Sequence, residues 1–328
     1  MSAPLTAKDY ATTQEVRWCP GCGDYAVLKA VQTLRAKGGA DKANTGFVSG
    51  IGCAARFPYY VDTYGFHTIH GRAPAVATGV KLANPDLDVW VVTGDGDGLS
   101  IGASHLMHAL RRNVGLKILL FNNEIYGLTK GQYSPTSRVG TRSPSSPGGS
   151  VDAPVSPGQY VMGCGAKFYA RAIDTDKVNM AHVLEQAHEF NGASLTEIYQ
   201  NCIVYNEDVF ASFTDRDDAA QTQLHLRHGK PMLFGENNDK GIRFNPDSWS
   251  LEVVDATASP DEVLVHDEAN PVLARLLIDL HVPVALGVIY RQPAQRFEDA
   301  FYGHHPSAMK RTKSVAEFIR GPNPWTVK

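Results

Sequence analysis

Two cysteines, Cys19 and Cys22, stand three positions apart near the start of the chain, in the stretch EVRWCPGCGD (15–24). A thiol pair at this spacing can be a redox-active dithiol, half of a zinc site or half of an iron–sulfur site, and this stretch alone leaves all three open. The chain has 328 residues and five cysteines, and a chain of this length buries a core that needs no disulfides. We therefore interpret the cysteines as metal ligands or reactive thiols.

A glycine-rich turn in the stretch VVTGDGDGLSIGA (91–103) follows a predicted buried strand and precedes a predicted helix. Glycines allow the backbone to approach a phosphate group, and the first amides of a helix can donate hydrogen bonds to it. The turn lacks the lysine of a nucleotide P-loop. It also fails the dinucleotide fingerprint, because Leu99 or Ile101 occupies the position of the third glycine.

Asp95 in this turn narrows the choice of ligand. A carboxylate beside a diphosphate repels it unless a cation lies between them, and Mg²⁺ is the natural bridge. The next predicted strand ends at Asn123, and a right-handed crossover would bring both strand ends to the carboxyl edge of one parallel sheet. Asp95, the Asn123 amide oxygen and the Ile125 carbonyl oxygen would then supply three ligands to Mg²⁺.

The pattern Gly-Asp-Gly, followed about 27 residues later by Asn122 and Asn123, resembles the diphosphate motif of thiamin diphosphate enzymes. The simpler alternative is a tight turn, with Asn123 capping a loop. Enzymes of the resembled class generally need a second module, which holds the aminopyrimidine and supplies an activating glutamate. This chain has one such module, so we expect another polypeptide to supply the missing half.

Short apolar runs alternate with helical patterns along the first two thirds of the chain. Asp24 is a plausible N-cap for a helix over DYAVLKAVQTLRAKGG (24–39). Strands are predicted at 45–50, 88–94, 116–123, 168–174 and 194–200, and helices at 73–84, 99–113 and 176–191. Nearly continuous Val, Ile and Leu in the strands indicates burial on both faces. The expected fold is therefore α/β, with a mostly parallel sheet flanked by helices.

The remaining cysteines can now be placed on this sheet. Cys53 and Cys202 each follow a predicted strand, so both thiols should lie at the carboxyl edge that carries the diphosphate site. Four thiolates suit a [4Fe–4S] cluster, and zinc accepts the same ligands. The thiamin motif favours the cluster, because oxidation at that cofactor needs an electron acceptor. Cys164 competes with Cys202 for the fourth position, although a single cysteine before a buried strand is more often a core residue.

Taken together, the four thiols and three motifs resemble the β subunit of 2-oxoacid:ferredoxin oxidoreductases. The motifs are HTIHGRAPAVATGVK (67–81), GDGD (94–97) and NNEIYGLTKGQYSPTS (122–137), and the resemblance extends over residues 18–206. It implies a thiamin diphosphate-binding fold and a coenzyme A-dependent oxidative decarboxylation of a 2-oxoacid, reversible as reductive carboxylation. It also implies electron transfer through [4Fe–4S] to ferredoxin, and an α-subunit partner in a dimer of heterodimers.

The resemblance also assigns roles to individual residues. The cofactor should be bound by Gly52, Cys53, His70, Gly94, Asp95, Gly96, Asp97, Asn123, Ile125, Gly127, Leu128 and Thr129. His70 would act beside the thiamin diphosphate, the alternative being a polar histidine of the core. Lys130 lies in a GLTKGQ loop that resembles that of 2-oxoglutarate-specific members, where a cation can pair with the distal carboxylate that pyruvate lacks. The alternative for Lys130 is an ordinary exposed loop lysine.

Composition restricts the partners and the compartment. With 31 basic and 34 acidic side chains the chain is almost neutral, so neither nucleic acid nor an anionic membrane is expected as a partner. No apolar run reaches the roughly 20 residues of a membrane span. The first residues, MSAPLTAKDYATT (1–13), lack the pattern of a signal peptide. The expected location is the cytoplasm.

Residues 1–206 are expected to form the cofactor-binding domain, and residues 207–328 a C-terminal extension that contacts a partner. The Pro-, Ser- and Gly-rich stretch 131–158 is either a disordered insert or a loop that folds over a ligand or partner. Two other functions remain open. One is a non-oxidative thiamin diphosphate decarboxylase or synthase with structural zinc. The other is a non-catalytic electron-transfer or scaffold subunit that has lost its cofactor.

Overall fold

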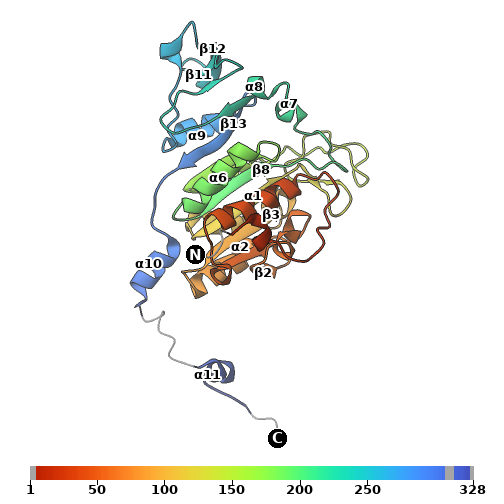
Figure 1. The fold of residues 1–328 in the computed structure, drawn as a ribbon, viewed down its shortest axis with the longest axis vertical. Helices are drawn as coiled ribbons and strands as arrows, with labels where there is room; N and C mark the ends of the chain where they lie inside the picture. The colour runs from red at the N-terminus through yellow and green to blue at the C-terminus, as the bar shows by residue number, and fades with distance from the viewer. Residues whose placement is uncertain (1–4, 307–313, 326–328) are drawn as a thin grey trace.

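The computed structural model of the chain describes residues 5–306 and 314–325 and is built around one eight-stranded sheet (Figure 1). In spatial order the strands are β2 (Tyr64–His67), β1 (Thr45–Ser49), β3 (Asp88–Gly94), β4 (Leu116–Asn122), β8 (Ser194–Tyr199), β7 (Phe168–Ile173), β13 (Val284–Arg291) and β9 (Gln223–His225). Strands β2 to β7 in this order are parallel, whereas β13 is antiparallel to β7 and parallel to β9. The predicted α/β class with a mostly parallel sheet is confirmed.

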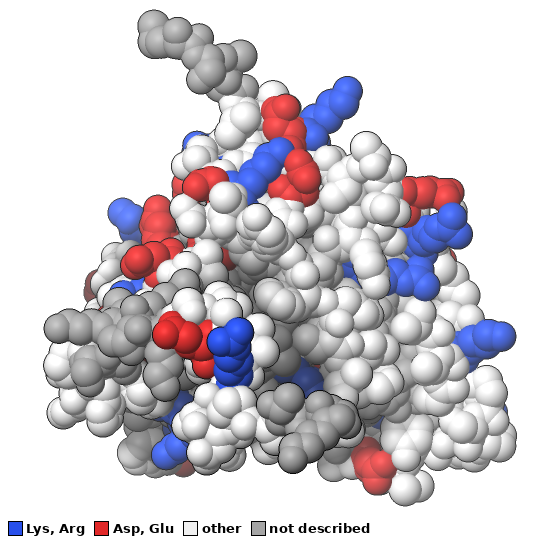
Figure 2. All heavy atoms as spheres, turned by 90° about the horizontal axis from the view of Figure 1, so that it is seen from below, with Lys and Arg blue, Asp and Glu red and all other residues white. Residues whose placement is uncertain are grey.

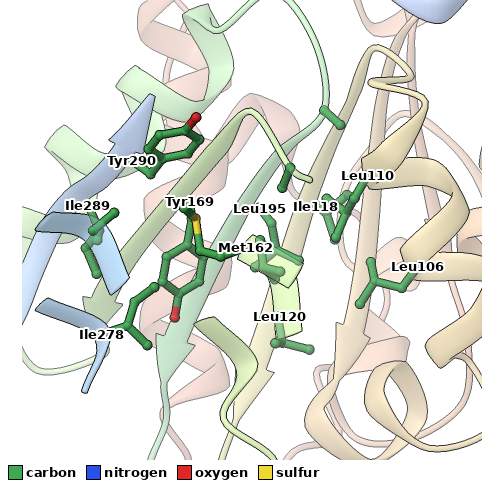
Figure 3. Packing of buried hydrophobic residues seen from close by; sticks show 14 of the residues in the cluster. Leu106, Leu110, Ile118, Leu120, Met162, Tyr169, Leu195, Ile278, Ile289 and Tyr290 are labelled. Carbon is green, nitrogen blue, oxygen red and sulfur yellow. The ribbon is translucent and has the colours of Figure 1, made fainter. Parts of the chain in front are cut away.

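Helices cover both faces of this sheet. One face packs against α1 (Asp24–Lys37), α6 (Lys177–Glu189) and the 3-10 helix η3 (Ala54–Tyr59), and the other against α2 (Ala73–Ala83), α4 (Ala103–Arg111), α5 (Pro157–Gly163) and α9 (Pro271–Ile278). Figure 3 shows the second face, where Leu106 and Leu110 of α4 meet Ile118 of β4 and Leu195 of β8. Because both faces are buried, the strands are apolar along their whole length, as the sequence indicated.

The remaining elements are short helices and the strands of two small sheets. The remaining helices are α3 (Asp95–Leu99), α7 (Ala211–Thr214), α8 (Ala219–Thr222), α10 (Phe297–His304) and α11 (Val315–Arg320), with 3-10 helices η1 (Ala7–Tyr10), η2 (Lys42–Asn44) and η4 (Pro260–Glu262). The remaining strands are β5 (Ile125–Tyr126) and β6 (Gln132–Tyr133), which pair with each other, and β10 (Leu233–Phe234), β11 (Lys240–Asn245) and β12 (Ser250–Asp255), which form a small antiparallel sheet.

Two local predictions are wrong. Asp24 is the first residue of α1, not its N-cap, and its carboxyl is buried, where desolvation and the neighbouring charge of Asp174 raise its pKa to about 7. The helix expected over 99–113 is broken into α3 and α4 around Ser100, whose backbone is not helical. A Cβ on the nearby Gly102 would lie 2.5 Å from the carbonyl oxygen of Asp97. The close packing of this connection therefore overrides the helical pattern of the sequence.

The large sheet does not end at residue 206, where the cofactor domain was expected to stop. β9 and β13 extend it, and α9 packs against β13. β11 and β12 also lie within residues 207–328, which were expected to form a C-terminal extension. After β13, α10 packs on the body, where Phe297 contacts the core and Glu298 is buried, whereas α11 lies at the lower end of Figure 1. Residues 307–313 and 326–328 of the predicted C-terminal extension, and residues 1–4 of the N-terminal stretch, lie outside the described part of the chain.

Figure 2 shows the molecule from the end that carries the last helices. On this face Lys and Arg alternate with Asp and Glu among mostly uncharged residues, and neither sign forms a continuous patch. Within the described ranges, none of the helices combines the length and the apolar character needed to cross a membrane.

Candidate active site

The glycine-rich turn and the Asn-Asn pair come together because β3 and β4 are adjacent parallel strands. Gly94, the last residue of β3, is paired with Phe121 near the end of β4. Asp95 therefore begins α3 at the same edge of the sheet where the chain turns at Asn123. This is the crossover arrangement that the sequence predicted.

A cavity of about 100 Å³ opens at this edge. It is lined by every residue assigned to the cofactor, namely Gly52, Cys53, His70, Gly94, Asp95, Gly96, Asp97, Asn123, Ile125, Gly127, Leu128 and Thr129, together with Ile51, Ala54, Ile101, Phe121 and Tyr126. Lys130 is exposed and does not line the cavity, although it directly follows Thr129, which does. Its backbone has a φ of 75°, an uncommon conformation for a residue with a side chain.

Gly96 makes room for an aromatic ring that the sequence did not single out. A Cβ at this position would lie 2.1 Å from Cε1 of Tyr126, and the hydroxyl of Tyr126 donates a hydrogen bond to the Gly96 carbonyl oxygen at 3.1 Å. Any side chain at residue 96 would displace the ring. The central glycine of the motif is therefore required by the packing of this wall.

Asp95 is a buried carboxylate that has no cationic side chain as a partner among the described residues. Its Oδ2 atom accepts hydrogen bonds from the hydroxyls of Ser134 at 2.5 Å and Thr136 at 2.6 Å. Burial raises the pKa of Asp95 to about 6, and these hydrogen bonds oppose the rise. A buried carboxylate with oxygen-rich neighbours fits a site for a hard cation such as Mg²⁺. The Asn123 amide oxygen lies next to the backbone of Ile125, whose N–H donates to it at 3.3 Å.

Asp97 has a different environment, although it lies in the same turn. Its Oδ1 atom accepts hydrogen bonds from the backbone N–H groups of Gly71 at 2.8 Å and Ile51 at 3.2 Å, and its Oδ2 from the Thr93 hydroxyl at 3.0 Å. This carboxylate fastens two cavity-forming loops to the turn. His70 lies beside it, with Nδ1 3.8 Å from Oδ1, and its side chain is 64% exposed. His70 is therefore not a buried core histidine.

The thiols gather next to this cavity. A Cβ on Gly127 would lie 3.5 Å from Sγ of Cys202 and 3.6 Å from Sγ of Cys53, so the two sulfurs flank this glycine. Cys22 accepts a hydrogen bond from Nε2 of Gln200 at 3.2 Å, and Cys19 is exposed. Burial, followed by the charge of Asp24, raises the pKa of Cys53 to about 12 and that of Cys22 further. Charges on the other thiols of the group contribute to both shifts.

Cys164 lies apart from this group. It caps α5 and packs beside Tyr160 against the core of the opposite face, whereas Cys22 and Cys53 pack against the face covered by α1 and α6. Within the part of the chain that the structure describes, no three His, Cys, Asp or Glu side chains converge closely enough to hold one metal ion.

Sequence reasoning missed Ser134 and Thr136. Both belong to the stretch 131–158, in which Ser134, Thr136 and Ser137 are buried and the first two contact Asp95 in the cavity wall. Their signal was present in the motif ending QYSPTS, but turn-forming residues carry no periodicity that would indicate which hydroxyls point inward.

Comparison with known proteins identifies this fold. Residues 50–198 match the family model of the thiamine pyrophosphate enzyme, C-terminal TPP binding domain. The site is thus that of a thiamin diphosphate-binding fold, with the turn at Asp95 inside the matched region. The chain is 44% identical to the 2-oxoglutarate oxidoreductase subunit KorB of Mycobacterium tuberculosis over an alignment of 335 residues. This alignment covers 99% of this chain and 89% of that protein.

Two further comparisons agree. The chain is 42% identical to the β subunit of 2-oxoacid:ferredoxin oxidoreductase 1 of Aeropyrum pernix, over 62% of this chain and 64% of that one. A solved 2-oxoglutarate:ferredoxin oxidoreductase from Magnetococcus marinus, with 2-oxoglutarate, coenzyme A and succinyl-CoA bound, superimposes with a TM-score of 0.76 and 30% identity, covering 98% of this chain and 97% of that chain. The chain belongs to the β-subunit family of the 2-oxoacid:ferredoxin oxidoreductases. It is therefore one subunit of an oxidoreductase that also contains an α subunit.

Proposed function

We propose that this chain is the catalytic β subunit of a 2-oxoglutarate:ferredoxin oxidoreductase. The reaction converts 2-oxoglutarate and coenzyme A into succinyl-CoA, carbon dioxide and a proton, while two electrons reduce two one-electron ferredoxin acceptors. It can also run in reverse as a reductive carboxylation. One observation carries the proposal: the buried carboxylate of Asp95, which has no cationic side-chain partner among the described residues, lies on the same edge of the sheet as a group of thiols.

The turn at Asp95 would hold the diphosphate of thiamin diphosphate through Mg²⁺. Asp95, the amide oxygen of Asn123 and the carbonyl oxygen of Ile125 would be the protein ligands of the ion, and the first amides of α3 would face the phosphates. When bound, the cofactor supplies the nucleophilic carbon that attacks the 2-oxo group of the substrate. The contribution of the chain is to bind and orient that cofactor and to keep the wall formed by Tyr126 in place.

We further propose that Cys19, Cys22, Cys53 and Cys202 hold a [4Fe–4S] cluster. A single zinc ion bound at 2.3 Å would require its four sulfurs to lie within about 3.8 Å of each other, whereas a cubane spreads its thiolates over four irons. Among the described residues no three such side chains lie close enough to hold a single ion. The cubane is favoured over zinc because oxidation at thiamin diphosphate needs an electron acceptor, and zinc has no redox chemistry. The raised pKa of the Cys22 and Cys53 thiols means that their thiolates need a bound cation of either kind.

The α subunit would complete the cofactor site. The cavity of about 100 Å³ is smaller than the roughly 300–1,000 Å³ of pockets that enclose small ligands. Exposed apolar side chains lie at its opening: Ile101 and Leu128 line it, and Ile69 directly precedes His70, which also lines it. A partner surface over this rim would bury these side chains and enclose the cofactor.

Lys130 is proposed to select the substrate. It follows the cavity wall at Thr129, and its ammonium would pair with the distal carboxylate of 2-oxoglutarate. His70, at the same rim, would act beside the cofactor. The proposal also includes a dimer of heterodimers, ferredoxin as the acceptor and the cytoplasm as the location. The name of the Aeropyrum pernix relative supports ferredoxin and a partner subunit.

The proposal is tested on the complex, obtained by coexpressing this chain with its α subunit under anaerobic conditions. We expect a visible absorption that bleaches when 2-oxoglutarate and coenzyme A are added, and ferredoxin or viologen reduction that is much faster with 2-oxoglutarate than with pyruvate. A colourless zinc-containing complex that releases carbon dioxide without reducing an acceptor would indicate the non-oxidative alternative. A complex that binds no thiamin diphosphate in titrations would indicate the non-catalytic one.

A further inference from the structure

Two hydroxyls from one loop bind the same oxygen of the diphosphate-site carboxylate. Ser134 and Thr136 both donate to Oδ2 of Asp95, at 2.5 and 2.6 Å, and among the described residues no hydroxyl donates to Oδ1. The three side chains are 3%, 5% and 2% exposed. Hydrogen bonds of this length from a hydroxyl to a carboxylate are charge-assisted and strong, so the orientation of the carboxylate is fixed.

Both hydroxyls are themselves held in place. The Thr136 oxygen lies 3.1 Å from Oδ1 of Asn122, whose Nδ2 donates to the fully buried Glu197 at 2.7 Å. The backbone N–H of Ser134 donates to the hydroxyl of Ser137 at 2.7 Å, and that hydroxyl donates to the carbonyl oxygen of Glu124. A hydroxyl has one proton to donate, and in each case the closest acceptor is Asp95.

This arrangement leaves Asp95 with one oxygen available to a cation. A monodentate carboxylate suits Mg²⁺, which requires near-octahedral geometry with few protein ligands. Ca²⁺ takes six to eight oxygens and often binds both oxygens of a carboxylate. Bidentate binding here would force Oδ2 to give up both hydroxyl hydrogen bonds.

We propose that Ser134 and Thr136 are positioning residues that make Asp95 a one-oxygen ligand and thereby favour Mg²⁺ over Ca²⁺ at the diphosphate site. The inference rests on the proposed function, because it assumes that thiamin diphosphate binds at this turn with a divalent cation. It assigns to the 131–158 loop a part in metal selection.

The test compares the affinity of the α/β complex for thiamin diphosphate in saturating Mg²⁺ and in saturating Ca²⁺, measured by titration calorimetry on metal-stripped protein. The variants are Ser134→Ala, Thr136→Val and the double substitution. Thr136→Val keeps the shape of the side chain and removes only the hydroxyl. Loss of one hydrogen bond to a charged group changes an equilibrium constant by about ten- to a hundredfold. We therefore expect the preference for Mg²⁺ to fall at least tenfold in each single variant, and further in the double one.

Ser150→Ala is the matched control. It removes a buried hydroxyl of the same loop that donates to the carbonyl oxygen of Arg138 at 2.8 Å and not to Asp95. We expect this control to leave unchanged the ratio of thiamin diphosphate affinities in Mg²⁺ and in Ca²⁺. Thr136→Ser, which keeps the hydroxyl, should also retain the wild-type ratio. If the double variant does not fold, judged by circular dichroism, Thr136→Val alone decides.

Equal weakening with both cations, or an unchanged ratio in Thr136→Val, would mean that the hydroxyls only support the loop and would overturn the inference. Both results leave the proposed function intact. A wild-type complex that binds thiamin diphosphate with neither cation would instead contradict the proposed function itself, and this inference with it.

Discussion

The diphosphate turn and the thiol group lie on the same edge of the sheet but are built in different ways. At the turn, Asp95 is fixed by two hydroxyls and Asp97 by two backbone amides and a third hydroxyl. In the thiol group, Cys19 is exposed and Cys22 accepts one side-chain hydrogen bond, from Gln200. The turn therefore has its shape before a cofactor binds, whereas the thiols need a metal to fix their positions. Substitutions at the turn should therefore weaken cofactor binding, whereas substitutions of the thiols should remove the cluster.

The largest expected effect is at Asp95. Asp95→Asn keeps the shape of the side chain but removes the negative charge that binds the cation. Deleting one partner of a buried charge pair costs about 3–5 kcal/mol. We expect thiamin diphosphate binding to weaken by more than a hundredfold while iron content stays the same. Calorimetry and iron analysis of the complex check both parts. Loss of iron together with the cofactor would show that the two sites are not independent.

At the thiols we expect loss of the cluster with cofactor binding retained. Cys202→Ala and Cys164→Ala form a matched pair of variants. Cys202 lies with Cys53 beside Gly127, whereas Cys164 packs against the other face of the sheet. Cys202→Ala should lose most of the visible absorption and of ferredoxin reduction but retain cofactor binding. Cys164→Ala should retain all three. An intact cluster in Cys202→Ala, with loss in Cys164→Ala, would reverse the assignment of the fourth ligand.

A smaller and more selective effect is expected at the rim. Lys130→Met should raise the KM for 2-oxoglutarate far more than the KM for pyruvate, because losing a desolvated charge pair typically costs about 2–5 kcal/mol. Cofactor affinity and cluster absorption should not change. Steady-state kinetics with both substrates provides the measurement. Equal changes in the KM values for 2-oxoglutarate and pyruvate would mean that Lys130 is an ordinary exposed loop residue.

The smallest expected effect concerns stability and is remote from both sites. Lys117, at the opposite end of β4 from Asn122, is buried, donates to the carbonyl oxygen of Phe190, and has its pKa lowered by burial to about 8. Between pH 8 and about 10.4 the unfolded chain binds a proton at this lysine that the native chain has lost, so unfolding becomes harder as pH rises. The stability of wild type relative to Lys117→Met should increase by roughly 2 kcal/mol over this range, since one pKa unit corresponds to about 1.4 kcal/mol.

Denaturant unfolding of the two proteins at pH 8 and pH 10 measures this difference. Cofactor and iron content should be unaffected by Lys117→Met at pH 7. A difference in stability that is flat with pH would mean that Lys117 keeps its proton in the native protein over this range, and would contradict the lowered pKa. Lys117→Met also serves as a reference for the Asp95 and Cys202 variants, since it perturbs the same sheet without touching either site.

The part of this architecture that follows from local pattern could be predicted from the sequence. β1, β3, β4, β7 and β8 are buried apolar runs, and each lies where the run was found. Because parallel strands share one carboxyl edge, the positions of Cys53 and Cys202 after two of them were enough to bring their thiols together.

What could not be predicted depends on contacts between distant segments. β13 joins the sheet antiparallel to β7 after more than a hundred intervening residues, and nothing in its own sequence specifies that partner. Asp24 has the residue type of a helix cap, yet packing buries it. Ser134 and Thr136 reach Asp95 through a loop without periodicity. In each case tertiary packing overrides or supplements the local signal.

One edge of this sheet should therefore carry both a divalent cation with a diphosphate and a four-iron cluster. X-ray diffraction from crystals of the α/β complex, collected above and below the iron absorption edge, tests it directly. We predict an iron signal enclosed by the sulfurs of Cys19, Cys22, Cys53 and Cys202, and separate density for a diphosphate and one light cation at Asp95. An iron signal in another part of the complex, a zinc signal at these sulfurs, or a turn without diphosphate in cofactor-saturated crystals would contradict the account.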